Sequence, residues 1–228
     1  MLEFMEVSKI YKKQQTAVKN ISMKIEKGEF VFLVGKSGAG KTTLIKLLLK
    51  EINPTSGKIY YDGKEITKLK NRQVPELRRR IGVVFQDFRL LPKMTVYENI
   101  AFAMEIVGNS SRNIRREVPT VLSMVGLSNK ANHYPDELAG GEQQRVAIAR
   151  AVINKPEIII ADEPTGNLDP ETSYEIMKIF TEINKRGTTL IMATHDRAIV
   201  DQMHKRVIEL KKGIIIRDSR EGGYYNEF

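Results

Sequence analysis

Residues 35–42 form a glycine-rich loop between two apolar stretches. Their sequence, Gly-Lys-Ser-Gly-Ala-Gly-Lys-Thr, has the spacing G-x-x-x-x-G-K-[ST], and it lies between the apolar runs 30–34 and 44–49. Glycines at this spacing let backbone N–H groups turn toward a polyphosphate, and a following helix adds its positive N-terminal end. Lys41 would reach the β- and γ-phosphates, and the Thr42 hydroxyl would bind Mg²⁺. The alternative, a glycine-rich turn with a solvated lysine, is disfavoured by the motifs below.

Length and composition limit the class of protein. A chain of 228 residues suits one large α/β domain or two small lobes. The sequence has no run of about 18 apolar residues and no basic, apolar leader at its start, so we expect neither a membrane span nor a signal peptide. Cysteine is absent, which excludes disulfides and thiolate–metal sites and fits a reducing cytoplasm.

The formal net charge of +9 permits contact with nucleic acid, anionic lipid or an anionic nucleotide. Basic residues cluster within 68–80, at Arg112, Arg115 and Arg116, and at Lys211 and Lys212. Each cluster alone is more typical of a solvated face, although together they leave a membrane-adjacent surface open. Aromatic residues make up 7% and are not interleaved with basic ones, so we expect no nucleic-acid partner.

The first half of the chain predicts strands around the glycine-rich loop. Residues 2–7 and 21–25 alternate apolar and polar side chains, 59–61 precede the turn pair Asp62-Gly63, and 81–85 form another apolar run. We expect a small antiparallel sheet from these segments. Thr95 and Glu98 form a capping-box pattern before a helix that reaches Val107.

Two more helices are predicted in the middle of the chain. Apolar residues recur at helical spacing over 114–125, where Pro119 predicts a helix start or a kink. A second helix is expected over about 142–154, before Pro156.

The last third alternates strands and helices. Residues 158–161 and 188–193 read as buried strands, and between them Asp169-Pro170 begins a helix that Gly187 ends. Residues 207–210 and 214–216 flank a Lys-Lys-Gly turn. From Asp218 to the end we find no pattern and expect exposure.

Acidic residues follow the strand 158–161. Asp162 ends an apolar run, where parallel sheets bind ligands, and would hold Mg²⁺. Glu163 would polarise a water molecule for attack on the γ-phosphorus. Without a phosphate loop elsewhere, the pair would equally suit a helix N-cap.

Two further motifs point to phosphate. Gly140 and Gly141 open a helix with bare N–H groups, which predicts a second phosphate site. One ATP at residues 35–42 leaves this site unused in a monomer, so it would cap the γ-phosphate held by another copy; the alternative is a simple helix-initiating turn. His195 ends the strand 188–193, which we expect beside the strand of Asp162. A structural role for this histidine is the alternative.

With these residues together, the chain resembles the ABC-type ATP-binding subunits over essentially its whole length. Residues 35–42 match the Walker A loop, 158–163 the Walker B strand, and 138–144 the ABC signature. Gln86 matches the Q-loop glutamine, Asp169 the D-loop and His195 the switch histidine. Tyr11 falls where the family stacks an aromatic ring on adenine, although it would equally suit a core position.

The resemblance implies an α/β fold: a P-loop NTPase (RecA-like) core with an antiparallel β subdomain, over 1–88 and 156–228, and a helical signature subdomain, over 89–155. It implies an ATP-driven homodimer with Mg²⁺ as cofactor, catalytic roles for Glu163, His195 and Gln86, and metal contacts from Thr42, Gln86 and Asp162. The implied nucleotide contacts are Tyr11, Gly35, Lys36, Ser37, Gly38, Ala39, Gly40, Lys41, Thr42, Thr43, Gln86, Asp162, Ala139, Gly140, Gly141, Glu142 and Asp169.

Within the family, the stretches 84–92, 95–99, 140–145, 161–169 and 192–196 are similar to the cell-division subgroup. That resemblance implies an FtsX-like integral membrane partner, attachment through it to the cytoplasmic face of the membrane at the division site, and activation of cell-wall hydrolases. Transport ATPases of the lipoprotein-release, macrolide-export or importer type are the alternative. A soluble ATPase acting on ribosomes or DNA is disfavoured by the single domain and the absence of sustained heptads.

Ala139 departs from the family pattern, which has serine at this position and a hydroxyl for the partner's γ-phosphate; Glu142 replaces the usual glutamine. We expect weaker dimer closure from the missing hydroxyl at Ala139, whereas glutamate at position 142 is common in the cell-division subgroup. The apolar run Leu90-Leu91-Pro92 with Tyr97 is expected to line the groove for a helix of the membrane partner.

Overall fold

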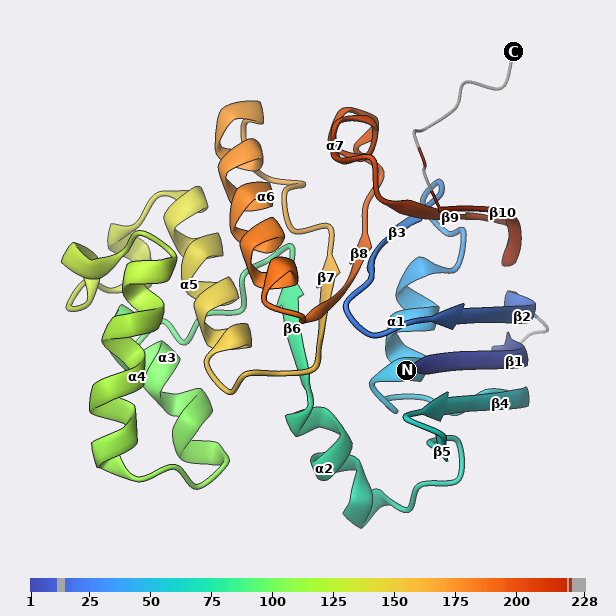
Figure 1. Cartoon of the computed structure of the whole chain (residues 1–228), viewed down its shortest axis with the longest axis horizontal. Helices are drawn as coiled ribbons and strands as arrows, with labels where there is room; N and C mark the ends of the chain where they lie inside the picture. Colours follow the sequence, from blue (N-terminus) through green and yellow to red (C-terminus); the bar gives the residue numbers. More distant parts are fainter. Residues whose placement is uncertain (12–14, 221, 223–228) are drawn as a thin grey trace. The chain divides into compact units, whose positions relative to one another are not determined.

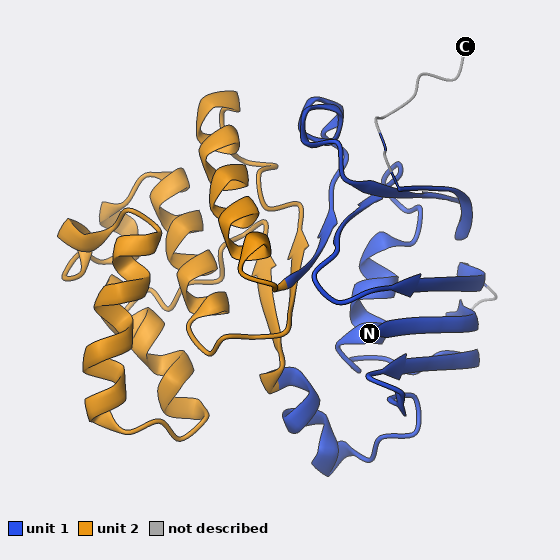
Figure 2. Cartoon of the chain, in the orientation of Figure 1, with its two compact units in different colours: residues 1–78, 189–228 blue, residues 79–188 orange. Residues whose placement is uncertain are grey.

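The structure is a computed structural model that describes residues 1–11, 15–220 and 222. They form two compact units, which Figure 2 shows in different colours. Unit 1 comprises residues 1–78 and 189–228, and unit 2 comprises residues 79–188, within the described ranges. The predicted division at residues 88 and 155 stays a prediction.

Unit 1 contains an antiparallel sheet in the order β2-β1-β4-β5 (Figure 1). Alternating residues are buried at Leu2 and Phe4 of β1 and from Ile21 to Ile25 of β2, as their sequence pattern predicts, and register shifts interrupt the alternation before Val7. The hairpin at Asp62-Gly63 is confirmed, and both residues have positive φ, 47° and 74°, which a two-residue turn between twisted strands requires. The bounds are β1 Leu2–Ile10, β2 Thr16–Ile25, β4 Ser56–Tyr61 and β5 Lys64–Glu65.

The second sheet of unit 1 surrounds β3. All five residues of β3 are buried, and β8 and β9 flank its two edges in parallel, as is typical of a central strand in a parallel sheet with both faces covered. The strand order here is β10-β9-β3-β8, and β10 runs antiparallel at the edge. The bounds are β3 Phe30–Val34, α1 Lys41–Leu48, β8 Thr189–Ala193, α7 Arg197–Met203, β9 Arg206–Lys211 and β10 Ile214–Ser219.

The expectation of a patternless segment from Asp218 onward is wrong for its first residues. Strand β10 continues through Ser219, and Asp218 accepts hydrogen bonds of 2.8 Å from both Nε and Nη2 of Arg206. Arg206 also donates to Glu29, and the hydrogen bond that Arg206 donates to Asp218 raises the pKa of this arginine. This charge pairing extends the strand beyond its apolar residues. Residues 221 and 223–228 lie outside the described part of the chain.

Unit 2 carries the parallel pair β6 and β7 and most of the helices. Residues 81–85 were expected in the antiparallel sheet; they form β6, which instead pairs in parallel with β7, Ile81 opposite Ile158 and Phe85 opposite Asp162. Helix α2 (Val74–Arg79) ends at the boundary between the units. The bounds in unit 2 are β6 Ile81–Phe85, α3 Val96–Ile106, α4 Ser111–Met124, α5 Gly140–Val152, β7 Ile158–Asp162 and α6 Pro170–Lys185.

Helix α4 does not begin at Pro119. It begins at Ser111 after the N-cap Ser110, and the proline lies inside it. Pro119 lies on the exposed side of the helix and has no N–H to donate to the preceding turn. Ile114, Val118 and Leu122 are buried along another stripe of the same helix. Packing of that stripe outweighs the local cost of the proline. Helix α5 begins at Gly140, two residues before its expected start.

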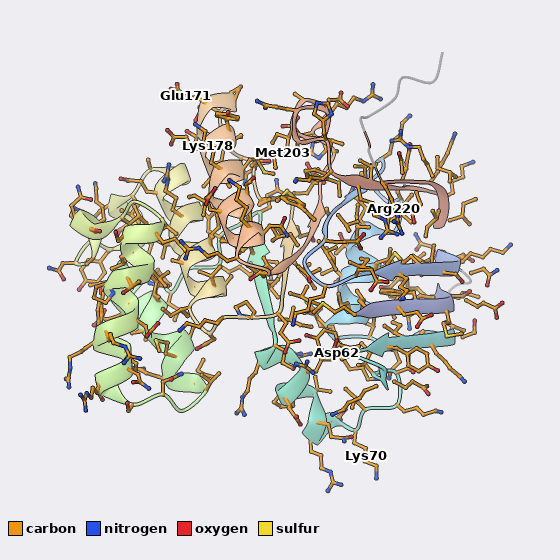
Figure 3. The ribbon with its side chains drawn as sticks, viewed as in Figure 1. Asp62, Lys70, Glu171, Lys178, Met203 and Arg220 are labelled. Carbon is orange, nitrogen blue, oxygen red and sulfur yellow. The ribbon has the colours of Figure 1, made fainter. Side chains whose placement is uncertain are left out.

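The basic cluster within 68–80 is mostly solvated. Lys70 extends away from the fold (Figure 3), and Lys68 pairs with Glu65 at 3.0 Å with three quarters of its side chain exposed. Arg80 forms a bidentate pair with Glu157. Outside this cluster, Glu171 and Lys178 are also exposed, on α6 (Figure 3). A surface beside a membrane stays a prediction.

The predicted capping box of α3 is confirmed. Thr95 Oγ1 accepts from the Glu98 N–H at 3.2 Å, and a Glu98 carboxylate oxygen accepts from the Thr95 N–H at 2.8 Å. One turn further, the fully buried Asn99 accepts from the Leu91 N–H and donates to the carbonyls of Leu91, Met94 and Thr95. This side chain therefore fixes the loop 91–95 against the first turn of α3.

Replacing this amide is expected to be costly. Asn99→Ala leaves buried backbone groups of the loop unpaired and should lower the free energy of unfolding by about 2–3 kcal/mol. Chemical denaturation followed by circular dichroism measures it. Asn109→Ala is the control, because Asn109 Nδ2 makes a single bond of 3.4 Å to Met104, and it should lower the free energy by less than about 1 kcal/mol. Equal losses in the two variants would contradict this role of Asn99.

Candidate functional site

The glycine-rich loop of unit 1 joins β3 to α1. Helix α1 begins after Gly40, which has a φ of 113° and provides no side-chain cap, so the N–H groups of the first turn stay open. A Cβ on Gly40 would lie 2.8 Å from both the Ala17 carbonyl oxygen and Val18 Cγ1. Only glycine fits where the loop meets β2, and the open N-terminus can accept an anion.

Lys41 lies inside the curve of this loop. Its side chain is buried, and Nζ donates a hydrogen bond of 2.6 Å to the Gly35 carbonyl oxygen. Lys36, Ser37 and Gly38 are exposed along the loop, as is Thr42 in the first turn of α1. The loop therefore brings a buried cation and an exposed hydroxyl to the same helix end.

The turn between β9 and β10 supports the loop from behind. The Gly213 N–H donates to the Ala39 carbonyl at 3.0 Å, and the Gly213 carbonyl accepts from the Lys19 N–H at 2.7 Å. A Cβ on Gly35 would lie 2.3 Å from the Leu210 carbonyl oxygen. The phosphate loop is thus built on backbone from β2 and from the hairpin β9–β10.

His195 is exposed and follows β8 by two residues. In the sheet register Ala193 lies opposite Leu33, so both strands end at the same edge, where the phosphate loop begins. Unit 1 therefore places His195 and the loop at one sheet edge. Tyr11 is 37% exposed, which excludes its alternative as a core residue, and Lys9 Nζ lies 5.5 Å from its ring centroid.

In unit 2 the residues Gln86, Asp162 and Glu163 lie at the ends of the paired strands β6 and β7. Phe85 lies opposite Asp162, so both strands end at the same edge. Gln86 Nε2 donates to Asn167 Oδ1 at 3.0 Å, and the Gly166 N–H donates to the Glu163 carbonyl at 3.1 Å. Glu163 has a φ of 50°, a conformation uncommon outside glycine, and this turn sets its carboxylate beyond the strand.

The predicted second phosphate site is an open helix end. Helix α5 begins at Gly140 after Ala139, which has no side-chain hydrogen bond to offer. A Cβ on Gly141 would lie 2.4 Å from Thr172 Cγ2, so glycine allows α5 to approach α6 there. The site opens into a groove of about 460 Å³ lined by Gly126, Leu127, Ala139, Gly140, Gly141, Glu142, Arg145, Asn167, Leu168, Asp169, Thr172 and Glu175.

Glu142 was expected as a nucleotide contact. In the structure its carboxylate binds the backbone at Ala139, directly before α5. Oε2 accepts from the Ala139 N–H at 3.0 Å, and Oε1 lies 3.4 Å from Lys130 Nζ. Asp169, in the same groove, caps α6 by accepting from the Thr172 N–H at 3.0 Å. Hydrogen bonds from the Thr172 side chain and N–H hold the pKa of Asp169 below its ordinary value.

Sequence reasoning missed Arg150. Its Nη1 and Nη2 donate to the carbonyls of Arg89 and Phe88, at 2.6 Å and 2.9 Å. Phe88 and Arg89 both have positive φ, 56° and 49°, so this arginine holds the strained turn after Gln86. Burial lowers the pKa of Arg150. An arginine among the residues of α5 gives no sequence signal, because its partners are backbone carbonyls.

A second groove of unit 2, of about 480 Å³, lies along α3 and α4. Its lining mixes apolar residues with both charges: Lys93, Met94, Tyr97, Glu98, Ala101, Phe102, Glu105, Ser111, Ile114 and Arg115. Tyr97 lines this groove, whereas Leu90, Leu91 and Pro92 are not among its lining residues, and the expected binding of a partner helix by these residues stays a prediction. Leu91 instead pairs its backbone with Asn99.

Two residues expected to hold Mg²⁺ carry oxygen donors of a suitable type. Among the described residues no group of three or more histidine, aspartate or glutamate side chains is placed to hold a metal. Thr42 in unit 1 carries a hydroxyl and Asp162 in unit 2 a carboxylate, and each is a type of oxygen ligand that Mg²⁺ accepts beside phosphates and water. Within the described ranges, none of the helices has the length and apolar character to cross a bilayer.

Comparison with known proteins gives a consistent result. Residues 18–166 match the family described as ABC transporter. The cell division ATP-binding protein FtsE of Mycobacterium tuberculosis is 55% identical over 225 residues, 98% of each chain. FtsE of Bacillus subtilis is 53% identical over 224 residues, again 98% of each.

Solved structures agree with the fold class. The dimeric ABC transporter cassette MJ0796 has a TM-score of 0.88 and 37% identity, and the match covers 98% of this chain and 100% of that one. The same cassette is known as a post-hydrolysis dimer with ADP and Pi, at a TM-score of 0.87. The expected P-loop NTPase fold with an antiparallel β subdomain and a helical part is confirmed.

The phosphate loop predicts a matched pair of glycine variants. Gly40→Ala places a Cβ 2.8 Å from β2 and should weaken binding of a fluorescent ATP analogue by at least about tenfold. A Cβ on Gly38 meets nothing within 4 Å, so Gly38→Ala adds only backbone strain of about 1–2 kcal/mol and should weaken binding less. Circular dichroism checks that both fold. A larger loss in Gly38→Ala would contradict this account of the loop.

Proposed function

Because the chain belongs to the ABC transporter family, we propose that it is the ATP-binding and ATP-hydrolysing subunit of a membrane complex that acts in bacterial cell division. The observation that carries the proposal is a pair of half-sites in one chain. Unit 1 holds the phosphate loop with the buried Lys41, and unit 2 holds the open N-terminus of α5. One nucleotide at the loop leaves the second half-site for the nucleotide of another copy.

The resulting assembly is a head-to-tail homodimer with two ATP molecules at its interface. In each site, residues 35–43 of one copy bind the phosphates and Tyr11 stacks on the adenine. The N–H groups of Gly140 and Gly141 from the other copy approach the γ-phosphate, and Asp169 faces the opposite subunit. ATP binding closes the dimer because only the triphosphate reaches both half-sites.

Hydrolysis relies on positioning and charge stabilisation. Glu163 orients the attacking water and accepts its proton, while Gln86 and His195 contact the γ-phosphate side of the site. Thr42 and Asp162, with Gln86, would hold Mg²⁺. When bound, the ion neutralises charge on the phosphate oxygens.

The membrane partner binds at the groove along α3 and α4. Its lining combines Tyr97 and Phe102 with Lys93, Glu98 and Arg115, which suits an amphipathic helix with apolar and charged groups. The partner is an FtsX-like integral membrane protein, which places this chain at the cytoplasmic face of the membrane at the division site. ATP-driven closure is transmitted through the partner to cell-wall hydrolases.

The cell-division role is favoured over transport by the two FtsE proteins, each more than 50% identical over 98% of the chain. The second candidate is the ATPase subunit of a lipoprotein-release, macrolide-export or importer system. It shares the nucleotide chemistry, and only the membrane partner separates the two candidates.

The dimer model predicts a trapped state. Glu163→Gln should bind ATP but lose at least about 99% of the ATPase rate, because an amide cannot accept the proton of water. Size-exclusion chromatography with light scattering should then show a dimer with MgATP and a monomer with MgADP. A variant that stays monomeric with ATP, although it binds the nucleotide, would refute the sandwich.

The partner is tested with the trapped variant. Tagged Glu163→Gln protein, incubated with solubilised membranes, should retain an FtsX-like protein together with division factors, identified by mass spectrometry. Adding Tyr97→Asp replaces an aromatic ring of the groove with a charged carboxylate and should release that partner without loss of the ATP dimer. Capture of a different permease, with a binding protein or a lipoprotein, would make the chain a transport ATPase.

Ala139 predicts a gain of function. Ala139→Ser, in the Glu163→Gln background, should tighten ATP-dependent dimerisation, because a hydrogen bond to a charged phosphate contributes about 1.5–3 kcal/mol. Serine at this N-cap also stabilises α5 directly, so thermal unfolding without nucleotide is the control for that effect. Equal dimer dissociation constants for the Glu163→Gln protein with and without Ala139→Ser, measured by analytical ultracentrifugation, would exclude the missing hydroxyl as a limit on closure.

A further inference from the structure

Residues 125–133, here called the linking segment, connect the end of α4 to the region before α5. Two of its carbonyls accept hydrogen bonds from the first turn of α3. The Val96 N–H donates to the His133 carbonyl at 2.8 Å, and the Tyr97 N–H donates to the Ala131 carbonyl at 2.9 Å. Because the first N–H groups of a helix have no partner within it, the linking segment completes the N-terminus of α3.

The same segment is fixed to α5 by two side chains. Arg145 Nη1 donates to the Val125 carbonyl at 3.0 Å, near the beginning of the segment. Lys130 Nζ lies 3.4 Å from Glu142 Oε1, and both side chains are about three quarters buried, at 27% and 29% exposure. The linking segment is therefore held to α3 through its backbone and to α5 through ionic and hydrogen-bonded side chains.

Glu142 connects this segment to the second phosphate site. Its other carboxylate oxygen accepts from the Ala139 N–H at 3.0 Å, directly before the glycines that begin α5. Gly126 and Leu127 of the linking segment line the same groove as these glycines. The contacts thus run from Tyr97, in the α3–α4 groove, through the linking segment and Lys130 to Glu142 and the loop at Ala139.

We propose that Lys130 is a positioning residue for the second phosphate site, and that the linking segment couples this site to the first turn of α3, where Tyr97 lines the α3–α4 groove. The inference rests on the proposed function, in which Gly140 and Gly141 bind the γ-phosphate held by another copy. Lys130 acts by neutralising and orienting the Glu142 carboxylate. Without it, an unpaired negative charge stands beside the place where the phosphate arrives.

The effect is specific to closure of the dimer. Lys130 belongs to unit 2, whereas the phosphate loop that binds nucleotide in the monomer belongs to unit 1. Loss of Lys130 therefore weakens dimerisation and leaves nucleotide binding to the monomer intact. If the ion pair were purely structural, its loss would change thermal stability, and it would not affect dimerisation and nucleotide binding to the monomer differently.

The test compares Lys130→Met and Lys130→Arg in the full-length Glu163→Gln protein. Lys155→Met is the matched control, because Lys155 pairs with Glu117 at 3.3 Å in the same unit and is 80% exposed. Three quantities are measured for each: the affinity of the monomer for a fluorescent ATP analogue, the ATP-dependent dimer dissociation constant, and the thermal midpoint without nucleotide.

Lys130→Met should raise the dimer dissociation constant by at least about fivefold, in the range of a modest coupling between sites, with less than about twofold change in monomer binding. Lys130→Arg should restore dimerisation, because guanidinium also pairs with carboxylate. The control should match the parent. Unchanged dimerisation in Lys130→Met, or an equal loss in the control, overturns the inference alone, whereas a parent that fails to dimerise with ATP overturns the proposed function.

A double-mutant cycle tests the route through Glu142. If Lys130 acts through this carboxylate, Lys130→Met should have little further effect in a Glu142→Gln protein, because the charge it neutralises is gone. Additive effects would show that Lys130 acts elsewhere. Hydrogen exchange tests the link to α3: ATP-driven dimerisation should slow exchange at Val96 and Tyr97, and Lys130→Met should reduce that change. Exchange at these amides that does not respond to dimerisation overturns the coupling.

Discussion

Each of the two candidate phosphate sites depends on a helix that begins without a side-chain cap. Helix α1 follows Gly40 and helix α5 follows Ala139, and neither residue offers an oxygen to the first N–H groups. Other helices of the chain are capped by Thr95, Ser110, Asp169 and Asp196. An uncapped helix end keeps its partial positive charge for an external anion. The backbone packing around Gly40, the contact of Gly141 with α6 and the brace from Glu142 all keep these ends open yet ordered.

Much of the fold could be predicted because its signals are local. The loop 35–42, the capping box at Thr95 and the hairpin turn at Asp62-Gly63 each depend on residues within a few positions of one another. The errors arose where a distant partner decides. Pro119 lies inside a helix because a buried stripe outweighs it, β10 continues because Asp218 meets Arg206, and β6 is parallel because it pairs with β7, a strand far along the chain.

The candidate site shows the same division between local and distant causes. Residue type and spacing predict roles for Lys41, Asp162, Glu163 and Gly140 without a structure. They cannot identify Arg150, Asn99 or Lys130, whose work is to hold backbone carbonyls, backbone N–H groups or a single carboxylate. Such residues have no motif of their own, because any segment of suitable shape presents the same backbone groups. The residues that bind a ligand are therefore easier to predict than those that position them.

Several polar groups expected to meet the nucleotide are already paired inside the protein. Lys41 donates to the Gly35 carbonyl, Gln86 to Asn167, and Glu142 holds the Ala139 N–H while facing Lys130. Binding therefore exchanges internal hydrogen bonds for bonds to phosphate, and each exchange contributes only a net of about 0.5–3 kcal/mol. In the proposed dimer, small net terms of this kind would leave the open and closed states near balance, so that a single phosphoryl group, the difference between ATP and ADP, would select between them.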